Sequence, residues 1–322
     1  MTLDKSSPKS VTIWRFIDGK PGHEKQSLGL VLAFAKLQNV NCHEIKIGGS
    51  AFKNLLDYCF GRSKSSIDLP IPDLLVGAGH RTHLPMLAAK RAYGGKSIVL
   101  MKPSLPYFLF DLCLVPEHDN PPERANIIPT IGALNPLGLD GHVKKIPSSH
   151  LILIGGPSPH YLWDNNIIIE QVEQIVKKEQ KSIQQWVLTT SPRTPKEFIE
   201  KLRERKLTDL KIYHFQDTKP GWVEEILLAS ENAWVTPDSV SMTYEALSAG
   251  CRTGVFELHP NKSNPRITHS IQALIKNEYI RTQKGFLYEK QKSNKIFTSQ
   301  ATACAKVIIQ KFCNKKKLKI ES

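Results

Sequence analysis

Four loops of this sequence combine glycines with polar side chains that could contact an anion or move a proton. Each follows a short apolar run and precedes a stretch with helical periodicity. In open α/β sheets ligands bind at such turns, because the carboxyl ends of strands and the amino ends of helices meet there. The sequence therefore predicts a ligand site assembled from several strand-to-helix turns.

The first loop is DGKPGHE, residues 18–24. Its two glycines allow the backbone to approach a ligand closely, although it is neither a Walker A loop nor a dinucleotide fingerprint. His23, with an ordinary pKa of about 6.5, could take a proton from a substrate hydroxyl, and Asp18 is the second candidate for this role. The alternative is a loop histidine that only hydrogen-bonds its neighbours.

The second loop is GAGHRTH, residues 77–83, a tight basic turn that would suit a phosphate or a carboxylate. Thr82 could equally be a simple helix cap. The loop has two histidines but no nearby carboxylate, so it does not indicate a metal site.

The third loop is GGPSPHY, residues 155–161, with TTSPRTP, residues 189–195, as its companion. The planar guanidinium of Arg193 could pair with a pyrophosphate. Thr194 and Pro195 also read as an ordinary helix start with proline at the first helical position. The two interpretations are compatible.

The fourth loop is TPDSVSMTYEA, residues 236–246, which brings a serine-rich turn to the start of a helix. Helix N-termini of this kind bind phosphate oxygens. Ser241 and Glu245 are four residues apart and so share one helix face, from which the carboxylate could accept hydrogen bonds from ribose hydroxyls. The alternative is that Asp238 or Ser239 caps the helix and Glu245 faces solvent.

Short apolar runs alternate with helical segments along most of the chain, which predicts an α/β fold with parallel sheets covered on both faces. Two series, separated near residues 135–149, predict two doubly wound, Rossmann-like domains. The expected strands are Thr12–Ile17, His43–Ile47, Leu74–Gly77, Ser97–Met101, Leu112–Val115 and Asn126–Ile131, then Leu151–Ile154, Trp186–Thr190, Lys211–Phe215, Ala233–Thr236 and Gly254–Leu258. The expected helices include Glu24–Gln38, Thr82–Tyr93, Ile167–Gln180, Pro195–Arg205 and Ser239–Ala249.

Composition narrows the class of protein. The chain has 322 residues and a formal net charge of +14, which favours anionic partners without choosing among phosphorylated substrates, anionic lipids and nucleic acid. The 6 cysteines form no CxxC pair, so neither a zinc site nor a disulfide framework is expected. No secretory signal or membrane-spanning run is visible, and a cytoplasmic location is expected.

Two further segments could contact a membrane. A helical segment from Thr298 is followed by the basic end KKKLKIES. A capping helix with a solvated end is the favoured interpretation, and contact with an anionic membrane is the alternative. The apolar segment PYFLF, residues 106–110, would suit an amphiphilic substrate, but a buried core element is favoured there.

The motifs DGKPGHEKQ, GAGHRTHLP, LIGGPSPHY, TTSPRTP and VTPDSVSMTYEALSAG together resemble the Elm-type mitochondrial fission protein family, whose bacterial members are described as glycosyltransferases. The resemblance implies a glycosyltransferase-B-like (GT-B-like) fold, with two Rossmann-type domains facing across a cleft. It places an acceptor domain at residues 1–145, a nucleotide-sugar donor domain at 146–297, and a C-terminal helix with a basic tail at 298–322.

Site residues follow from these motifs. On the donor side the resemblance implies Gly155, Gly156, Arg193, Ser239, Ser241 and Glu245, and the same loops add Ser158 and Asp238 as candidates. On the acceptor side it implies Gly19, Gly22 and His23, and the loops add Lys20, His80 and Arg81; His23 and Asp18 are the catalytic candidates. Two departures from the family pattern are Pro192, where a second basic residue is usual, and the turn CRTG at residues 251–254.

The resulting expectation is a metal-independent glycosyltransferase that needs no cofactor and moves a sugar from a nucleotide-sugar donor. Its acceptor would be an amphiphilic cell-envelope or lipopolysaccharide-type glycan or glycolipid, with peripheral contact at the inner membrane. The alternatives are a nucleotide-sugar epimerase on the same fold and a non-catalytic scaffold. Nucleic acid is not an expected partner, because the lysines are dispersed and no aromatic stacking motif occurs.

Overall fold

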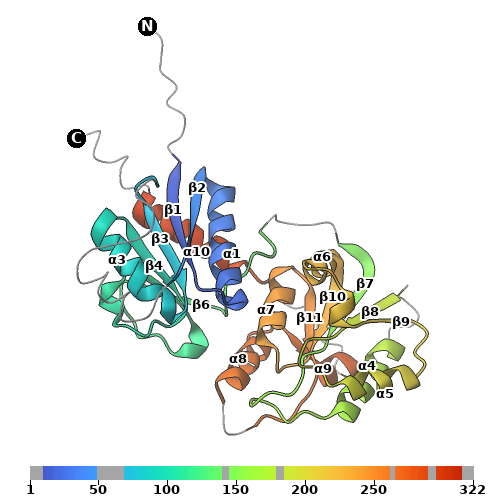
Figure 1. The fold of residues 1–322 in the computed structure, drawn as a ribbon. Helices are drawn as coiled ribbons and strands as arrows, with labels where there is room; N and C mark the ends of the chain where they lie inside the picture. Colours follow the sequence, from blue (N-terminus) through green and yellow to red (C-terminus); the bar gives the residue numbers. More distant parts are fainter. Residues whose placement is uncertain are drawn as a thin grey trace. The chain divides into compact units, whose positions relative to one another are not determined.

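The computed structural model describes residues 10–48, 69–139, 145–178, 185–261, 265–288 and 295–313. The chain divides into two compact units, one within residues 1–139 and 299–322 and the other within residues 140–298. Each unit holds a 6-stranded parallel sheet with helices packed beside it (Figure 1). The predicted α/β fold with two Rossmann-like sheets is confirmed.

The first sheet has the strand order β2-β1-β3-β4-β5-β6. Its strands are β1 (Val11–Ile17), β2 (Val40–Lys46), β3 (Leu74–Ala78), β4 (Lys96–Leu100), β5 (Leu112–Pro116) and β6 (Ile127–Thr130). The helical elements of this part of the chain are α1 (Pro21–Leu37), the 3-10 turns η1 (His80–Thr82), η2 (Tyr107–Leu109) and η3 (Glu117–Asp119), and α3 (His83–Tyr93).

Side-chain alternation along the strands explains why both faces of this sheet are covered. Ile13 of β1 belongs to a core that includes α1, whereas its neighbour Trp14 belongs to a second core with α3. Successive strand residues point to opposite faces, so two apolar neighbours in sequence bury two different helical layers. This double burial accounts for the continuous apolar strands read from the sequence.

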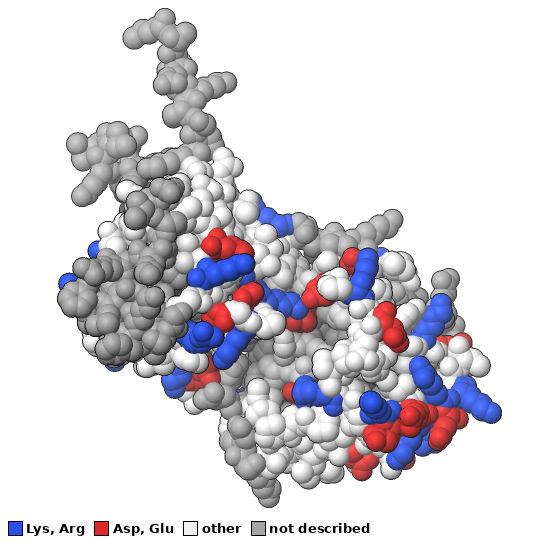
Figure 2. Space-filling view, in the orientation of Figure 1, with Lys and Arg blue, Asp and Glu red and all other residues white. Residues whose placement is uncertain are grey.

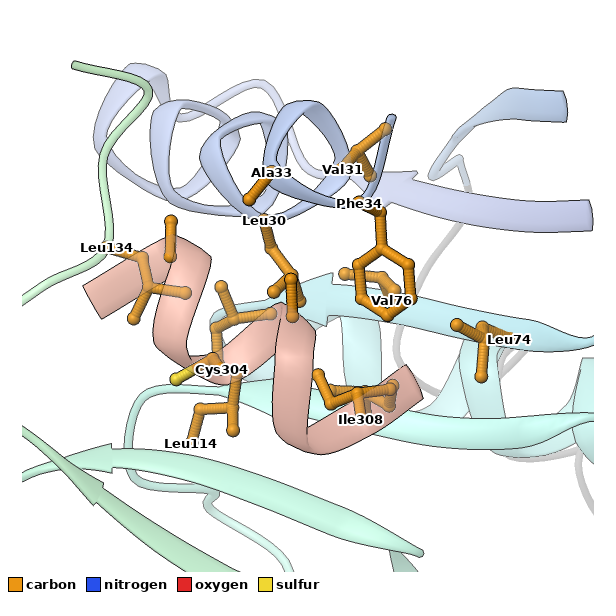
Figure 3. Close-up of a cluster of buried hydrophobic side chains, with 14 of the residues drawn as sticks. Leu30, Val31, Ala33, Phe34, Leu74, Val76, Leu114, Leu134, Cys304 and Ile308 are labelled. Atoms are coloured by element: carbon orange, nitrogen blue, oxygen red, sulfur yellow. The ribbon is translucent and has the colours of Figure 1, made fainter. Parts of the chain in front are cut away.

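The C-terminal segment returns to the first unit. After the second unit, α10 (Gln300–Ile308) and a π-helical turn (Ile309–Cys313) follow. Cys304 and Ile308 pack with Leu30 and Phe34 of α1 and with strand residues of the first sheet (Figure 3). The predicted C-terminal helix is therefore present as a layer of the first unit, while the basic end at 315–322 lies outside the described residues.

The second sheet has the order β12-β11-β10-β7-β8-β9. Its strands are β7 (Ile146–Leu153), β8 (Gln185–Thr189), β9 (Leu210–Tyr213), β10 (Ser230–Val235), β11 (Arg252–Val255) and β12 (Arg281–Thr282). Its helical elements are α4 (Asn165–Lys178), α5 (Lys196–Glu204), the turn η4 (Phe215–Asp217), α6 (Trp222–Ala229), α7 (Val240–Ser248), α8 (Pro265–Lys276) and α9 (Gln283–Tyr288).

Strand order reverses once in each sheet, between β1 and β3 in the first and between β7 and β10 in the second. Helices leave opposite faces on the two sides of such a reversal, so the loops part and leave a crevice at the carboxyl ends of the strands. The predicted loops at residues 18–24 and 77–83 follow β1 and β3, and those at 155–161 and 236–246 follow β7 and β10. All four loops thus lie at switch points.

Three local expectations differ from the structure. Helix α5 begins at Lys196, so Pro195 is the residue before the helix and not its first residue. The segment at residues 106–110 is not a core strand or helix, because it forms a short turn in which Phe108 is 74% exposed while Phe110 is buried. The two-residue strand β12 was not expected, since it is too short to show a pattern.

No helix in the described part of the chain is long and apolar enough to span a bilayer. On the face seen in Figure 2, lysine and arginine are interspersed with aspartate and glutamate instead of forming one basic surface. The net positive charge is therefore dispersed over this face.

Candidate functional site

At the switch point of the first sheet, His23 and Asp18 form a hydrogen-bonded pair. Asp18 follows β1 with its side chain fully buried, and its Oδ2 lies 2.9 Å from His23 Nδ1. The backbone N–H of Lys20 donates to Asp18 Oδ1 at 3.2 Å. Since Nδ1 is used by the carboxylate, Nε2 is the nitrogen that the half-buried ring can offer to a substrate.

Burial acts to raise the pKa of Asp18, but hydrogen bonds from His23 and from the Lys20 backbone, with the charges of both residues, outweigh it and lower that pKa below its ordinary value. The carboxylate is therefore charged near neutral pH. A charged, buried acceptor beside Nδ1 orients the imidazole ring and favours the tautomer with its proton on Nδ1.

The second loop meets the first through Gly79. This residue has φ +84°, and a Cβ on it would collide with the imidazole ring of His23. The ring therefore lies directly on the Gly79 backbone, which only glycine permits. His80 and Arg81 are exposed on η1, beside this contact in sequence.

The glycines of the first loop have different roles. Gly19 has φ +80° and donates its N–H to Glu24 Oε1 at 2.9 Å, so it makes the turn into α1. Gly22 is exposed within the first turn of α1, where a Cβ would meet nothing within 4 Å. Lys20 is exposed and occupies the N-cap position of α1, where its side chain makes no capping hydrogen bond.

The burial of His83 was not expected from the sequence. It begins α3, is 1% exposed, and places Nδ1 3.1 Å from Ser104 Oγ. Burial, aided by the charge of His80, lowers the pKa of His83 to about 4. His83 is therefore neutral at physiological pH and is a structural residue of this loop.

Burial of neutral His83 predicts acid sensitivity. The unfolded chain takes up the proton near pH 6.5 and the folded one only near pH 4, so stability falls as pH drops through this window, by about 3 kcal/mol in total. We expect His83→Gln to flatten the dependence of unfolding free energy on pH between 6.5 and 4, measured by urea denaturation. His269→Gln, at an exposed histidine of α8, should leave it unchanged; equal slopes in both variants would contradict this assignment.

At the switch point of the second sheet, the glycine pair after β7 is locked to the loop after β10. Gly155 donates its N–H to Thr236 Oγ1 at 2.7 Å, and Gly156 donates to Asp238 Oδ2 at 3.0 Å. Both backbone donors are thus used within the protein. A phosphate at this loop would have to meet other groups.

Arg193 is held by the same network. Its Nη2 lies 2.8 Å from Asp238 Oδ2, and its Nη1 donates to the carbonyls of Gly156 and Pro157 at 3.0 and 3.2 Å. The Asp238 side chain is fully buried, whereas that of Arg193 is 43% exposed. The guanidinium is therefore fixed on its inner side and presents its outer edge to the surface.

Ser158 has a local role in the same loop, since its Oγ accepts the N–H of His160 at 3.3 Å. Ser158 is half-buried and pairs with Tyr161 in an isolated β-bridge. It closes the turn after β7 and lies two residues from Gly156.

Helix α7 starts beside Asp238 without a side-chain cap. Ser239 occupies the N-cap position but makes no capping hydrogen bond, and the first helical bond runs from Thr243 N–H to Ser239 O. The N–H groups of the first helical turn therefore have no acceptor within the helix, and with the helix dipole they favour an anion. Ser239 is thus the N-cap residue, as the alternative interpretation has it, but its side chain makes no capping hydrogen bond.

Ser241 and Glu245 form the predicted pair on one face of α7. Ser241 Oγ donates to Glu245 Oε1 at 3.1 Å. Glu245 is 8% exposed, so the alternative in which it faces solvent is wrong. A buried carboxylate in the second turn of this helix, held by a serine of the first turn, is a pre-oriented hydrogen-bond acceptor.

A cavity of about 220 Å³ adjoins this loop and was not foreseen from the sequence. Its walls are mostly apolar and come from the carboxyl ends of β10, β11 and β12, from helix α8 and from the loop after β7. The lining residues are Tyr161, Pro237, Val255, Phe256, Glu257, Leu258, Pro260, Thr268, Ile271, Gln272, Ile275 and Thr282. Pro237 precedes Asp238, so the cavity and the polar network share one loop.

Among the described residues, no group of three or more histidine, cysteine, aspartate and glutamate side chains is arranged to hold a metal ion. The residues of both switch points are instead hydrogen-bond donors and acceptors.

The chain has two Rossmann-like units, each with polar loops at the switch point of its sheet, and this is the architecture of a GT-B-like fold. The UDP-GlcNAc 2-epimerase from Methanocaldococcus jannaschii is similar in structure, with a TM-score of 0.56, 13% identity and coverage of 93% of this chain and 100% of that chain. A glycosyltransferase from Rickettsia africae ESF-5 has a TM-score of 0.52, 9% identity and coverage of 97% and 98%. At these identities the likeness shows the fold.

The chain belongs to the family described as mitochondrial fission ELM1, whose model matches residues 21–312. The resemblance read from the five sequence motifs is thereby confirmed. The uncharacterized protein RP120 of Rickettsia prowazekii (strain Madrid E) is 23% identical over 319 residues, which cover 84% of this chain and 90% of that protein.

Proposed function

We propose that this protein is a glycosyltransferase that binds a nucleotide-sugar donor at the β7/β10 switch point. The observation that carries the proposal is that three features lie together at the loop after β10 and the helix that follows it. These are the uncapped start of α7, the buried Glu245 with its partner Ser241, and the cavity beside Pro237. An anion site, a hydroxyl acceptor and an apolar pocket match the phosphates, ribose and base of a nucleotide.

Each group in this site has a role in the proposal. The first-turn N–H groups of α7 and the outer edge of Arg193 stabilise the charge that grows on the departing nucleoside diphosphate. Glu245 accepts hydrogen bonds from the ribose, and the cavity takes the base. Asp238 holds Arg193 and Gly156 in place.

On the first unit, the proposal gives His23 the part of general base toward an acceptor hydroxyl, with Asp18 as the group that orients it. Gly19, Lys20, Gly22, His80 and Arg81 would border the acceptor. We propose an amphiphilic acceptor of cell-envelope or lipopolysaccharide type, reached by peripheral contact with an anionic membrane. The exposed Phe108 and the basic sequence composition support this choice.

A nucleotide-sugar epimerase is the second candidate, and the structural likeness to a UDP-GlcNAc 2-epimerase supports it. The two differ in one observable, because an epimerase would isomerise its donor without any acceptor. A non-catalytic family scaffold would do neither.

Binding to nucleotide sugars tests the proposal. UDP-, GDP-, CMP- and ADP-linked sugars are added in a thermal unfolding assay, and the matching donor should stabilise the protein by about 2.7 kcal/mol at 100 times its Kd. Glu245→Ala should lose most of this ligand-induced gain. Glu200→Ala, at an exposed glutamate of α5, should retain it. If none of the four donors stabilises the wild-type protein, the donor site is not where we place it.

A further inference from the structure

Gln171 in the middle of α4 binds both backbone groups of one residue. It is 7% exposed, and its Nε2 donates to the carbonyl of Glu257 at 2.8 Å while its Oε1 accepts the N–H of Glu257 at 2.7 Å. One side-chain amide thus replaces the neighbouring strand that residue 257 lacks. These two bonds fix the peptide planes on both sides of Glu257.

Glu257 lies where the second sheet has ended. The last pair between β11 and β12 is Val255 with Thr282, and Phe256 still donates its N–H to Val235 O at 3.1 Å. Among the described residues, Glu257 and Leu258 have no strand partner, and the chain is next paired at Pro260, which forms an isolated bridge with Tyr161. The Glu257 carboxylate accepts the N–H of Lys284 at 3.1 Å, so α9 anchors the side chain while α4 anchors the backbone.

This segment is a wall of the cavity. Val255, Phe256, Glu257 and Leu258 all line it, together with Tyr161 and Pro237. Gln171 itself is not among the lining residues, so it acts on the cavity only through the backbone it holds. A rotation of the Glu257 peptide would turn the backbone groups of both neighbours relative to the cavity.

Gln171 is a polar residue on a helix face that is otherwise apolar and buried. Val172 and Ile175 on the same helix are fully buried in the apolar core of the second unit. Burial of an amide there is unfavourable unless its hydrogen bonds are made, and both of its bonds go to one loop residue. The amide therefore stabilises one specific conformation of the cavity wall.

We infer that Gln171 is a positioning residue that determines which nucleotide base the cavity accepts. The inference rests on the proposed function, in which the cavity holds the base of the donor. Gln171 sets the backbone of residues 256–258, and that backbone decides which hydrogen-bonding edge of a base is matched. Loss of the clamp should relax the choice of base and not merely weaken binding.

The test compares nucleoside diphosphates in the full-length protein. Kd values for UDP, CDP, GDP and ADP are measured by titration calorimetry for the wild type, Gln171→Met and the control Gln174→Met. Gln174 is exposed one turn along α4 and accepts a hydrogen bond from Gln283. We expect Gln171→Met to bind the preferred nucleotide about tenfold more weakly, because two neutral hydrogen bonds that hold the cavity wall are lost. The ratio of its Kd for the next-best nucleotide to its Kd for the preferred one should also be smaller than in the wild type. Gln174→Met should match the wild type.

Gln171→Glu is the second variant, and it keeps the shape of the side chain. Near pH 7 its carboxylate cannot donate to the Glu257 carbonyl, whereas a protonated carboxyl at lower pH can. Relative to the wild type, its preference among nucleotides should recover as pH falls toward 5.

The outcomes separate this inference from the proposed function. If the wild type binds no nucleoside diphosphate, the proposed donor site fails. If the wild type binds one and Gln171→Met shows the same ratio of Kd values, or Gln171→Glu has the pH profile of the wild type, only the role of Gln171 is refuted.

Discussion

Replacement of His23 by glutamine is expected to lower the rate of sugar transfer by about 10²–10⁴-fold while nucleotide affinity stays unchanged. The ring lies on the Gly79 backbone with Nδ1 2.9 Å from the buried Asp18 carboxylate, so Nε2 is oriented before any substrate binds. Glutamine keeps the polarity of the side chain but cannot take a proton near neutral pH. The loss should therefore fall on turnover.

Asp18→Asn tests the same assignment from the other side. An asparagine amide can donate to Nδ1, which moves the imidazole proton to Nε2, and a protonated Nε2 cannot accept the proton of a hydroxyl. This variant should show a loss of turnover similar to that of His23→Gln despite a nearly unchanged shape. Exposed His269 of α8 gives the control, since His269→Gln should keep the wild-type rate.

The rate is read as nucleoside diphosphate released from the donor in the presence of a membrane glycolipid fraction. A His23→Gln protein with wild-type turnover would remove the histidine from the mechanism. Isomerisation of the donor without the glycolipid fraction would instead select the epimerase.

The positions of the four loops could be predicted because the signals for them are local. A strand ends, glycines and polar residues follow, and a helix begins, all within about ten residues. Parallel topology then places these turns at the carboxyl edge of each sheet. The contact between Ser241 and Glu245 was also predictable, since a four-residue spacing on a helix fixes which side chains meet.

The partners of Arg193 and Asp238 could not be predicted in the same way. Asp238 binds Gly156, 82 residues away in sequence, and the two meet only because β7 and β10 are neighbours in the sheet. From the sequence, Arg193 and Gly156 were both expected beside a pyrophosphate, but their common link to Asp238 was not expected. Only the tertiary structure shows that the Asp238 carboxylate joins the two loops.

The cavity and its Gln171 clamp were missed for a related reason. A glutamine within the apolar pattern of a helix carries no sign of the loop it will bind, because its partner Glu257 is 86 residues away. Likewise, nothing local marks His83 as buried beside Ser104. Neither hydrophobic periodicity nor sequence motifs identify residues whose role depends on a distant backbone group, although such residues determine the shape of the site.

Gly156→Ala is expected to lower the unfolding free energy by about 3 kcal/mol and to abolish nucleotide binding. A Cβ on Gly156 would collide with the backbone carbonyl of Arg193 and lie 2.7 Å from the Arg193 Cβ. Backbone cannot move aside as a flexible side chain can, so the loops after β7 and β8 must separate. That movement breaks the bond from Arg193 Nη1 to Gly156 O and the bond from Gly156 N to Asp238.

The matched control is Gly22→Ala, which makes the same change in the first loop. A Cβ there meets nothing within 4 Å, so stability should change by no more than about 0.5 kcal/mol and nucleotide binding should be unaffected. Unfolding in urea followed by circular dichroism gives the stabilities, and calorimetric titration gives the affinities. Because the collision involves the loop that holds Arg193, both quantities should fall together in Gly156→Ala. Wild-type stability with lost binding would show that Gly156 touches the ligand itself and that the close approach of the two loops is not what requires a glycine.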